Sequence, residues 1–407
     1  MKDKSLTGKT IMILGAAKAQ IPLVKAARSL GLKTVVVSTP GDWPCFPMAD
    51  EAVTADISDP EAVLISAEKH RIDGIATCCM DTGVPALGKV CEDLGLNGPG
   101  WQAARTARNK LLMKEAFQRA GLCCARHRVL NCAEDLEAAA EELSFPMVLK
   151  AVDLMGSRGI CFCRDLSQAR EYFSFVMEQT KKDYCLAEEF LDGEMFDGEA
   201  MVQDGRLLFT MFSNSRLIRA HVPTSIGHSI PWRRQTDLGE EAAACMAGAC
   251  AALGLDHSAF DCDLMVKDGK VYIIELNARA GACCLPELIG RAYGIDYYEV
   301  LVRLAMGQDV SAFFAHRDPA ASAAAMIISR ESGILRSIGT DPDRMPPVLP
   351  RNRLWIDFAA NPGDSVRAYT NGRDSLGEMV VSAPTLEEAE SILDAALGAV
   401  NCALTTI

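Results

Sequence analysis

The stretch 260–279 carries polar side chains at a spacing that could bind a metal ion. Two apolar runs flank a Lys-Asp-Gly-Lys turn, and Asp-Gly between such runs is typical of a β-hairpin. Side chains alternate faces along a strand, so Asp261 and Asp263 share one face of the first strand. Glu275 and Asn277 share a face of the second strand for the same reason. The hairpin therefore gathers carboxylate and amide oxygens on its surface.

The chemistry that such a hairpin could support is Mg²⁺ binding, since Mg²⁺ prefers oxygen ligands and takes one or two carboxylates together with substrate phosphates. Arg279, at the end of the second strand, would add a planar fork for a phosphate or a carboxylate. A solvated hairpin face with scattered charge explains the local pattern equally well, because one face of a sheet is often polar. The residues alone leave both interpretations open.

The length of the hairpin turn decides which of these side chains lie together. With a loop of only the Asp-Gly pair, Asp263 would lie opposite Ile274 and point away from Glu275. A loop of odd length, with Gly269 in the left-handed conformation, places Asp261, Asp263 and Glu275 on one face. We predict the odd loop, because a two-residue turn would remove one carboxylate from the proposed site.

A lysine and a glycine-rich segment upstream of the hairpin could contact an anion. Lys150 closes an apolar strand, where a buried ammonium is costly unless an anion pairs with it. Gly156, Ser157, Arg158 and Gly159 follow it, and exposed backbone N–H groups beside serine and arginine can fold around a phosphate. An ordinary β-turn explains the two glycines equally well.

The segment from Arg216 to Trp232 is long and basic for an acidic protein. We predict a functional loop, either a lid or a wall of the substrate site, with a solvated loop as the alternative. Within it, Arg216, His221 and His228 are candidate substrate-binding residues. The two histidines are also candidates for a general base, although a loop histidine more commonly serves as a structural hydrogen-bonding group.

Composition narrows the class of protein. The chain has 407 residues, enough for two or three domains, and a net charge of −13, which argues against a nucleic-acid partner bound by bulk electrostatics. No apolar run reaches the roughly 20 residues that span a bilayer. The 16 cysteines include no C-x-x-C pair, and we expect most to be small core residues in a reducing compartment. We therefore expect a cytoplasmic protein without nucleic-acid or membrane partners.

The predicted elements place these residues on a mixed α/β and α+β framework. Near the N-terminus, strands at 10–15, 33–38 and 72–77 alternate with helices at 20–30 and 84–94, which predicts a small parallel sheet. Further helices are expected at 111–119, 135–143, 240–253, 285–293 and 297–306. The last part of the chain is expected to hold strands at 323–328, 354–358 and 377–382 and a helix that begins at Thr385 with a capping box.

Taken in chain order, the N-terminal α/β unit, Lys110, Lys150 with the glycine segment 156–159, the segment 188–191 and the acidic hairpin resemble the ATP-grasp superfamily of carboxylate-amine ligases. The resemblance extends along almost the whole chain. The similarity is to amino-acid ligases and to the glycinamide ribonucleotide and carbamoyl phosphate relatives. It implies an N-terminal pre-ATP-grasp α/β domain, a central ATP-grasp domain of two α+β subdomains and a small C-terminal α+β closing domain. The expected boundaries are 1–105, 106–190, 191–310 and 311–407.

The resemblance assigns residues to ATP position by position. It implies that Lys110 and Lys150 bind the phosphates and that Gly156 to Gly159 form the loop that covers them. Glu194 would meet the ribose hydroxyls. The linker whose backbone holds the adenine edge would comprise Glu188, Glu189, Phe190 and Leu191.

The resemblance also assigns the hairpin. Asp263, Glu275 and Asn277 fall on the metal ligands, for Mg²⁺ or Mn²⁺, and Arg279 falls near the transferred phosphate. Relatives usually have Glu or Gln where Asp263 stands, which makes Asp261 the competing first ligand. Two further departures, Ala278 for proline and Gly281 for a glycine pair, could loosen the loop that receives the acyl acceptor.

The implied activity is ATP-dependent ligation through an acyl phosphate. A carboxylate would attack the γ-phosphorus of ATP, with Lys150 and Arg279 neutralising charge, and an amine would then expel phosphate. The alternatives are a carboxylase- or formyl-transfer-type enzyme that activates bicarbonate or formate, and a non-catalytic nucleotide-binding protein. The implied partners are a small carboxylate and a small amine, and the chain is compatible with a homodimer.

Overall fold

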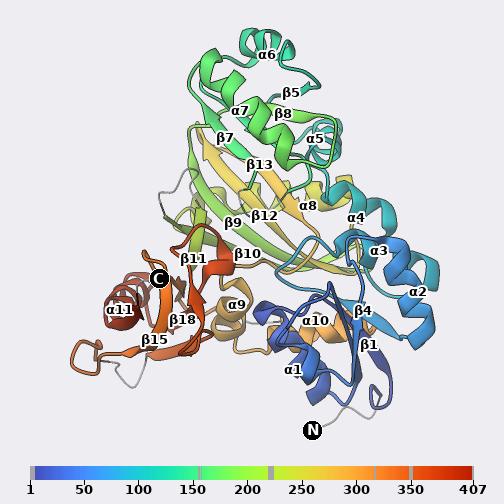
Figure 1. Cartoon of the computed structure of the whole chain (residues 1–407), viewed down its shortest axis with the longest axis vertical. Helices are drawn as coiled ribbons and strands as arrows, with labels where there is room; N and C mark the ends of the chain where they lie inside the picture. The colour runs from blue at the N-terminus through green and yellow to red at the C-terminus, as the bar shows by residue number, and fades with distance from the viewer. Residues whose placement is uncertain are drawn as a thin grey trace.

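The computed structural model describes residues 5–154, 156, 158–218, 224–315, 318–347 and 352–405. In Figure 1 the N-terminal unit (blue) and the C-terminal unit (red) lie at one end, and the segment drawn in green around β5 to β8 lies at the other. A long sheet that includes β9, β12 and β13 connects the two ends. Within the described ranges, no helix is both long and apolar enough to cross a membrane.

The N-terminal unit is built on a parallel four-stranded sheet in the order β3-β2-β1-β4. The predicted alternation of strands and helices is confirmed, although the sequence analysis omitted β3 and α2. β3 has only a half-buried pattern, whereas α2 begins with a clear signal, an Asp59 cap followed by proline. Its elements are β1 (Thr10–Leu14), η1 (Lys18–Gln20), α1 (Ile21–Ser29), β2 (Lys33–Ser38), η2 (Phe46–Met48), β3 (Glu51–Thr54), α2 (Pro60–His70), β4 (Gly74–Ala76), α3 (Val84–Leu94) and α4 (Trp101–Ala107).

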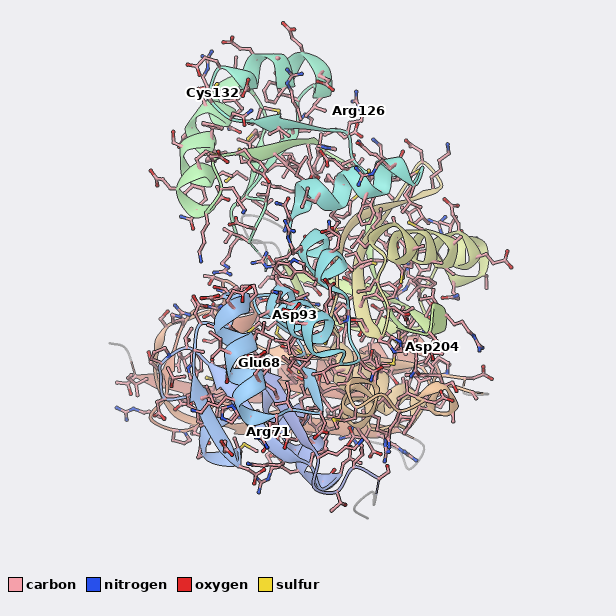
Figure 2. The ribbon with its side chains drawn as sticks, turned by 90° about the vertical axis from the view of Figure 1, so that its right-hand side faces the viewer. Glu68, Arg71, Asp93, Arg126, Cys132 and Asp204 are labelled. Atoms are coloured by element: carbon pink, nitrogen blue, oxygen red, sulfur yellow. The ribbon has the colours of Figure 1, made fainter. Side chains whose placement is uncertain are left out.

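The next unit is an antiparallel sheet in the order β5-β8-β6-β7, covered by two helices that enclose its own apolar core. The turned view of Figure 2 shows Arg126 and Cys132 on this unit, at the far end of the molecule from Arg71 of the N-terminal unit. The elements are α5 (Lys110–Arg119), β5 (His127–Leu130), α6 (Asp135–Leu143), β6 (Met147–Lys150), β7 (Ile160–Cys163), α7 (Leu166–Gln179) and β8 (Cys185–Glu189).

The largest sheet has eight strands in the order β13-β12-β9-β10-β11-β14-β18-β16. It runs without a break across the expected boundary at residues 310 and 311, because β14 pairs with β11. The elements from β9 to β14 are β9 (Glu194–Gln203), β10 (Arg206–Ile218), β11 (Thr224–Ile230), α8 (Gln235–Leu253), β12 (Ser258–Lys267), β13 (Lys270–Asn277), α9 (Leu285–Tyr293), α10 (Tyr297–Ala305), η3 (Ser311–Phe313) and β14 (Ser322–Ile327).

The C-terminal unit adds β16 and β18 to the large sheet and forms a second sheet in the order β17-β15-β19. The Thr385 half of the predicted capping box is confirmed, since the Thr385 hydroxyl accepts a hydrogen bond from the backbone N–H of Glu388, whereas Glu388 Oε1 accepts one from the Asn352 side chain. The elements are β15 (Gly333–Thr340), β16 (Arg353–Phe358), β17 (Ser365–Val366), η4 (Gly372–Asp374), β18 (Gly377–Ser382), α11 (Leu386–Gly398) and β19 (Val400–Thr405).

A shared hydrophobic core fixes the N-terminal unit against the large sheet. Leu23 of α1, Leu288 of α9 and Val300 of α10 belong to one buried cluster, which also contains Ala324 of β14. Figure 1 shows α9 and α10 between the blue unit and the sheet. The sixteen cysteines are free thiols and most are buried, in agreement with their predicted role as small core residues.

The predicted loop from Arg216 to Trp232 is wrong. The chain continues as β10 to Ile218 and returns as β11 from Thr224, so most of the segment is a β-hairpin. β11 lies between β10 and β14, and Gly227 allows the close approach of β14, because a Cβ there would lie 2.1 Å from the Ala324 carbonyl oxygen. Arg216 and His228, two of the polar residues that suggested a loop, are strand residues whose side chains contact other polar groups.

Candidate active site

The polar residues of the hairpin lie in two rows across three neighbouring strands. Asp263 lies opposite Glu275 on one side and opposite Asp197 of β9 on the other. In the next row, Asp261 lies between Asn277 and Glu199 of β9. Directly opposed residues of antiparallel strands point to the same face, so both rows share one face of the sheet. The predicted gathering of Asp261, Asp263 and Glu275 on one face is confirmed.

The predicted odd loop is wrong, although its consequence is right. Lys267 pairs with Lys270, which leaves a two-residue turn whose residues both have positive φ, 51° for Asp268 and 72° for Gly269. The register then shifts by one residue between Asp263 and Leu264, a β-bulge that restores the pairing of Asp263 with Glu275. The bulge, rather than the turn, keeps the carboxylate in the row.

The row of Asp197, Asp263 and Glu275 carries more negative charge than the neighbouring cations neutralise. Burial, and then the charges of the neighbouring Asp197 and Glu275 carboxylates, raise the pKa of Asp263 to about 7, against the opposing effect of Arg279 and Lys110. Among the described residues, no group of three or more His, Cys, Asp or Glu side chains forms a metal-binding cluster. The donor set fits an Mg²⁺ that takes one or two carboxylates and completes its shell with phosphate oxygens, rather than a cage made of protein alone.

Lys110 connects the hairpin with the unit before it. Its ammonium donates hydrogen bonds to Glu275 Oε1 at 2.9 Å and to the Leu154 carbonyl at 2.8 Å. Its backbone N–H donates to the Val152 carbonyl at 3.0 Å. Lys110 therefore holds the segment after β6 over the carboxylates of the large sheet.

A second charged cluster lies at the end of β6. Lys150 Nζ lies 2.9 Å from Glu188 Oε2, and Lys114 Nζ of α5 lies 3.2 Å from the same atom. The anion that Lys150 was predicted to need is thus Glu188, whereas Lys114 was not predicted. Burial by itself would raise the pKa of Glu188, but Lys114 and Lys150 lower it to about 2. Burial would lower the pKa of Lys150, but Glu188, Glu275 and Asp263 raise it above its ordinary value.

The predicted adenine linker begins inside β8. Because side chains alternate along the strand, Glu188 points inward, whereas Glu189 forms an ion pair with Arg126 at 2.9 Å. Phe190 is 37% exposed and packs edge-on against Phe162, and the next residue, Leu191, is buried. Glu194 is the exposed first residue of β9.

The glycine segment forms a tight turn between β6 and β7. Gly156 and Gly159 have φ of 63° and 64°, a conformation that favours glycine, and the Ala151 N–H donates to the Gly159 carbonyl. Arg158 is exposed on this turn. Ser157 lies outside the described residues.

Arg279 is held between two carboxylates. Its Nη1 forms an ion pair with Asp261, and its Nε lies 2.5 Å from Oδ1 of Asp81, a residue of the N-terminal unit. Both Asp81 and Arg279 are less than one tenth exposed. Asp81 was not predicted, because nothing near it in the sequence indicates contact with a residue about two hundred positions away.

Glu199 is a second residue that the sequence analysis missed. It is fully buried in β9 and accepts hydrogen bonds from the Gly281 N–H at 2.9 Å and from the Tyr297 hydroxyl at 2.8 Å. Burial, and then the charge of Asp261, raises the pKa of Glu199 well above its ordinary value. Glu199 therefore anchors the segment that follows Arg279.

The candidate substrate-binding residues of the segment 216–232 do not form one site. His228 is 2% exposed, with Nδ1 3.2 Å from Asp197 Oδ2 and 3.3 Å from the Ser213 hydroxyl, which is a structural role rather than that of a solvent-facing base. Arg216 forms an ion pair with Asp394 of α11 at 2.6 Å. His221 lies outside the described residues.

Comparison with known proteins identifies the class. Family models match an ATP-grasp N-terminal domain at 24–98, an ATP-grasp domain at 107–283 and an L-amino acid ligase C-terminal domain 2 at 325–405. A solved phosphoribosylglycinamide synthetase from Anaerococcus prevotii is 34% identical, with a TM-score of 0.81, over 98% of this chain and 100% of that one. The chain belongs to the ATP-grasp family.

Two further relatives extend the comparison. An L-amino acid ligase from Bacillus licheniformis has a TM-score of 0.80 over 98% of this chain and 100% of its own, and its 20% identity shows a common fold. Alanine--anticapsin ligase of Bacillus subtilis is 28% identical over 266 residues, which are 60% of this chain and 56% of that enzyme. The match thus spans little more than half the length of this curated relative.

Proposed function

We propose that the protein is an ATP-dependent ligase that joins a small carboxylate, such as an amino acid, to an amine through an acyl phosphate. The observation that carries the proposal is the contact between Lys110 and Glu275. The Lys110 ammonium, which lies beside the segment expected to cover the phosphates, is 2.9 Å from the Glu275 carboxylate of the hairpin. A nucleoside triphosphate with its metal ion needs an ammonium for the phosphates and a carboxylate for the metal within a few ångströms of each other.

The residues at the phosphate end divide by charge. Asp263, Glu275 and Asn277 would hold Mg²⁺, or Mn²⁺, which when bound neutralises phosphate charge and orients the oxygens. Lys110 and Lys150 would bind the phosphates, and the turn 156–159 would cover them and exclude water. Glu188 keeps Lys150 charged and fixes where its ammonium points.

The linker and the ribose contact complete the nucleotide site. The backbone at 188–191 would bind the adenine edge, and Phe190 offers an exposed ring beside it. Glu194 would accept hydrogen bonds from the ribose hydroxyls. The side chains of Glu188 and Glu189 are already engaged by Lys150 and Arg126, and the N–H groups of Glu189 and Phe190 donate to the Arg126 and Pro146 carbonyls, so the remaining backbone groups of the segment would bind the adenine.

The reaction has two steps. A carboxylate oxygen of the first substrate attacks the γ-phosphorus, the bond to ADP breaks, and an acyl phosphate forms. The amine nitrogen then attacks the acyl carbon, the carbon–oxygen bond to phosphate breaks, and the amine loses a proton. Arg279 would bind the anion at the reacting carbon, in a position fixed by Asp81 and Asp261.

The substrate class is supported by the names of the relatives. Three of them are an alanine--anticapsin ligase, a dapdiamide A synthase and a carnosine synthase, and the C-terminal match is to an L-amino acid ligase domain. These names favour an amino acid as one substrate. The 34% identical structure carries the name phosphoribosylglycinamide synthetase, which favours an amine as the acceptor.

The test is a matrix of amino acids and small acids assayed pairwise for ATP-dependent phosphate release, with products weighed by mass spectrometry. The proposal expects at least one pair that releases phosphate and yields a condensed product lighter than the two substrates by one water. Bicarbonate and formate are included as acids. Phosphate release with either of them, and with no other acid, would favour the carboxylase or formyl-transfer alternative. ATP binding without any turnover would favour a nucleotide-binding protein.

A further inference from the structure

Two carboxyl groups that the candidate site does not use meet where α9 packs against the C-terminal unit. Glu287 lies in the first turn of α9. Glu378 lies in β18, opposite Met326 of β14 on one side and Asp357 of β16 on the other. Directly opposed residues share a face, and Met326 belongs to the same buried cluster as Leu288 of α9, so this face of the sheet is turned toward the helix. A hydrogen bond joins the two carboxyl groups, and both side chains are half-buried.

This contact requires a proton, because two ionised carboxylates have no donor to share and repel each other. Burial raises the pKa of Glu287, although hydrogen bonds from the Tyr298 hydroxyl and from Glu378 oppose the rise. Burial, and then the charge of Glu287, raises the pKa of Glu378 well above its ordinary value. Glu378 therefore holds the proton and donates it in a hydrogen bond to Glu287.

The surroundings of the pair contain no cation that would offset a second charge. Within the ranges that the structure describes, neither carboxyl forms an ion pair with a lysine, an arginine or a histidine. Arg291, one turn further along α9, lies over the ring of Trp355, 5.2 Å from its centroid. The titratable groups that face the pair are an acid of β16, a hydroxyl of α10 and two thiols, namely Asp357, Tyr298, Cys284 and Cys79.

The pair lies at the C-terminal end of the loop 280–284. Cys284 ends this loop as the residue before α9, three positions ahead of Glu287, and has a φ of 71°. At the other end of the loop, the Cys79 thiol of the N-terminal unit donates a hydrogen bond to the Gly281 carbonyl at 3.2 Å. The N-terminal unit thus holds the beginning of the loop, and the carboxyl pair holds the helix that follows its end.

We propose that Glu287 and Glu378 share one proton and form a pH-sensitive contact that holds the loop 280–284 and the start of α9 against the C-terminal unit. While the proton is bound, the contact is a hydrogen bond. When the proton leaves to water, two carboxylates repel each other across the same contact, so rising pH loosens the loop. Under the function proposed above, this loop lies beside the residue that would bind the anion at the reacting carbon, but the contact and its test do not depend on that function.

The folded state binds a proton here that the unfolded chain releases. A glutamate of the unfolded chain ionises near the ordinary value of 4.5, whereas the pair keeps its proton above that pH because both pKa values are raised. The free energy of unfolding therefore falls as the pH rises from about 4.5 through the raised pKa values. In Glu378→Gln the amide N–H can donate to Glu287 in place of the proton, so this loss should disappear.

The test compares the full-length unaltered chain with Glu378→Gln and with the control Glu331→Gln. Glu331 is exposed before β15 in the same unit, so it controls for the loss of one carboxylate. Denaturant titrations at stepwise pH give the unfolding equilibrium constant. Hydrogen exchange of peptides that cover 280–293, corrected for the intrinsic rate at each pH, reports on the loop and α9. Glu287→Gln, which also leaves a single carboxyl in the contact, keeps the test valid if Glu378→Gln does not fold.

The proposal expects the unfolding constant of the unaltered protein to rise, relative to that of Glu378→Gln, by about tenfold for each pH unit over which the pair keeps its proton. Glu331→Gln should follow the unaltered protein. Corrected exchange in 280–293 should become faster with rising pH in the unaltered protein and in Glu331→Gln, but not in Glu378→Gln. The proposal is overturned if Glu378→Gln and the unaltered protein show the same pH dependence of stability. It is equally overturned if their stabilities diverge while exchange in 280–293 does not.

Discussion

Two buried charge clusters of opposite composition lie at the two sides of the candidate site. At one side, Lys114 and Lys150 surround the single carboxylate of Glu188. At the other, Asp81 and Asp261 surround the single guanidinium of Arg279. The first cluster has an excess positive charge and the second an excess negative charge.

The difference indicates what each side can accept. The lysine cluster has charge to spare for an anion such as a phosphate. Arg279 is already paired with two acids, so an anion bound to it would arrive with a cation of its own. The interpretation of Arg279 as an open fork, which its sequence position suggested, is therefore incomplete, because two acids already occupy it. Glu275, held by Lys110, lies in the carboxylate rows between the two clusters.

The largest expected effect is on Glu275. In Glu275→Gln, turnover of the substrate pair found by the assay matrix is expected to fall at least about 100-fold, because charge stabilisation at the transferring phosphoryl group contributes several kcal/mol. The melting temperature is expected to fall only modestly, because the change takes the carboxylate from Lys110 but also removes a charge that repels Asp263. The control is Glu68→Gln, on the exposed surface of the N-terminal unit (Figure 2). Full activity in Glu275→Gln would remove this residue from the phosphate end.

The lysine cluster is broken by Glu188→Gln, which leaves two ammonium groups buried without their carboxylate. The free energy of unfolding is expected to fall by about 3 kcal/mol, as for other buried pairs that lose one partner. Glu189→Gln in the same strand is the matched control and should cost less than about 1 kcal/mol, because Arg126 is half exposed. Denaturant titration measures both, and equal losses would contradict the account.

The same cluster predicts a pH dependence. The pKa of Glu188 is lowered from an ordinary value near 4.5 to about 2, so its stabilising effect is full above pH 4.5 and is lost as the pH falls toward 2. The stability difference between the unaltered protein and Glu188→Gln should therefore shrink over this range. Denaturant titrations at stepwise lower pH measure the difference, and a constant difference down to the lowest folded pH would show that Glu188 does not titrate as its contacts indicate.

The arginine cluster is tested through Asp81, which we expect to position Arg279 without touching ATP. Asp81→Asn should lower kcat about tenfold, the effect of one weakened charged contact, and leave the KM for ATP nearly unchanged. Asp81→Glu should restore part of the rate because it restores the charge. Asp93→Asn, on the surface of the same unit in Figure 2, is the control. A change in the KM for ATP with no change in kcat would place Asp81 in a different role.

The smallest expected effect concerns the anchor behind Arg279. Tyr297→Phe removes the hydroxyl that donates to Glu199 and should lower the free energy of unfolding by about 1 kcal/mol. Tyr272→Phe, at a half-buried position of β13, is the comparison and should lower it less. If both changes cost the same, the Glu199 contact has no special part in holding the segment after Arg279.

Local patterns in the sequence predicted most of the elements that carry the site. The apolar run before Lys150, the Asp-Gly turn and the glycine-terminated helices each have a short-range physical cause, and the structure has them at or near the predicted residues. The need of Lys150 for an anion also followed from its position. These features depend on neighbours within a few residues along the chain.

What the sequence did not predict depends on contacts between distant segments. Asp81, Lys114 and Glu199 have no local signal, because each gains its role only when another element packs against it. The bulge in β13 depends on the register of three strands rather than on one residue. The hairpin of β10 and β11 was read as a loop because its polar side chains face other polar groups across the sheet, which no alternation of polar and apolar residues reveals.

The most direct test of the central claim follows an oxygen atom. With the substrate pair in hand, the carboxylate of the first substrate is labelled with ¹⁸O, and the released phosphate is analysed by mass spectrometry. An acyl phosphate intermediate transfers one labelled oxygen to each phosphate released, because the carboxylate oxygen stays on phosphorus when the amine displaces it. Released phosphate that carries no label, alongside a condensed product, would contradict the mechanism proposed for this protein.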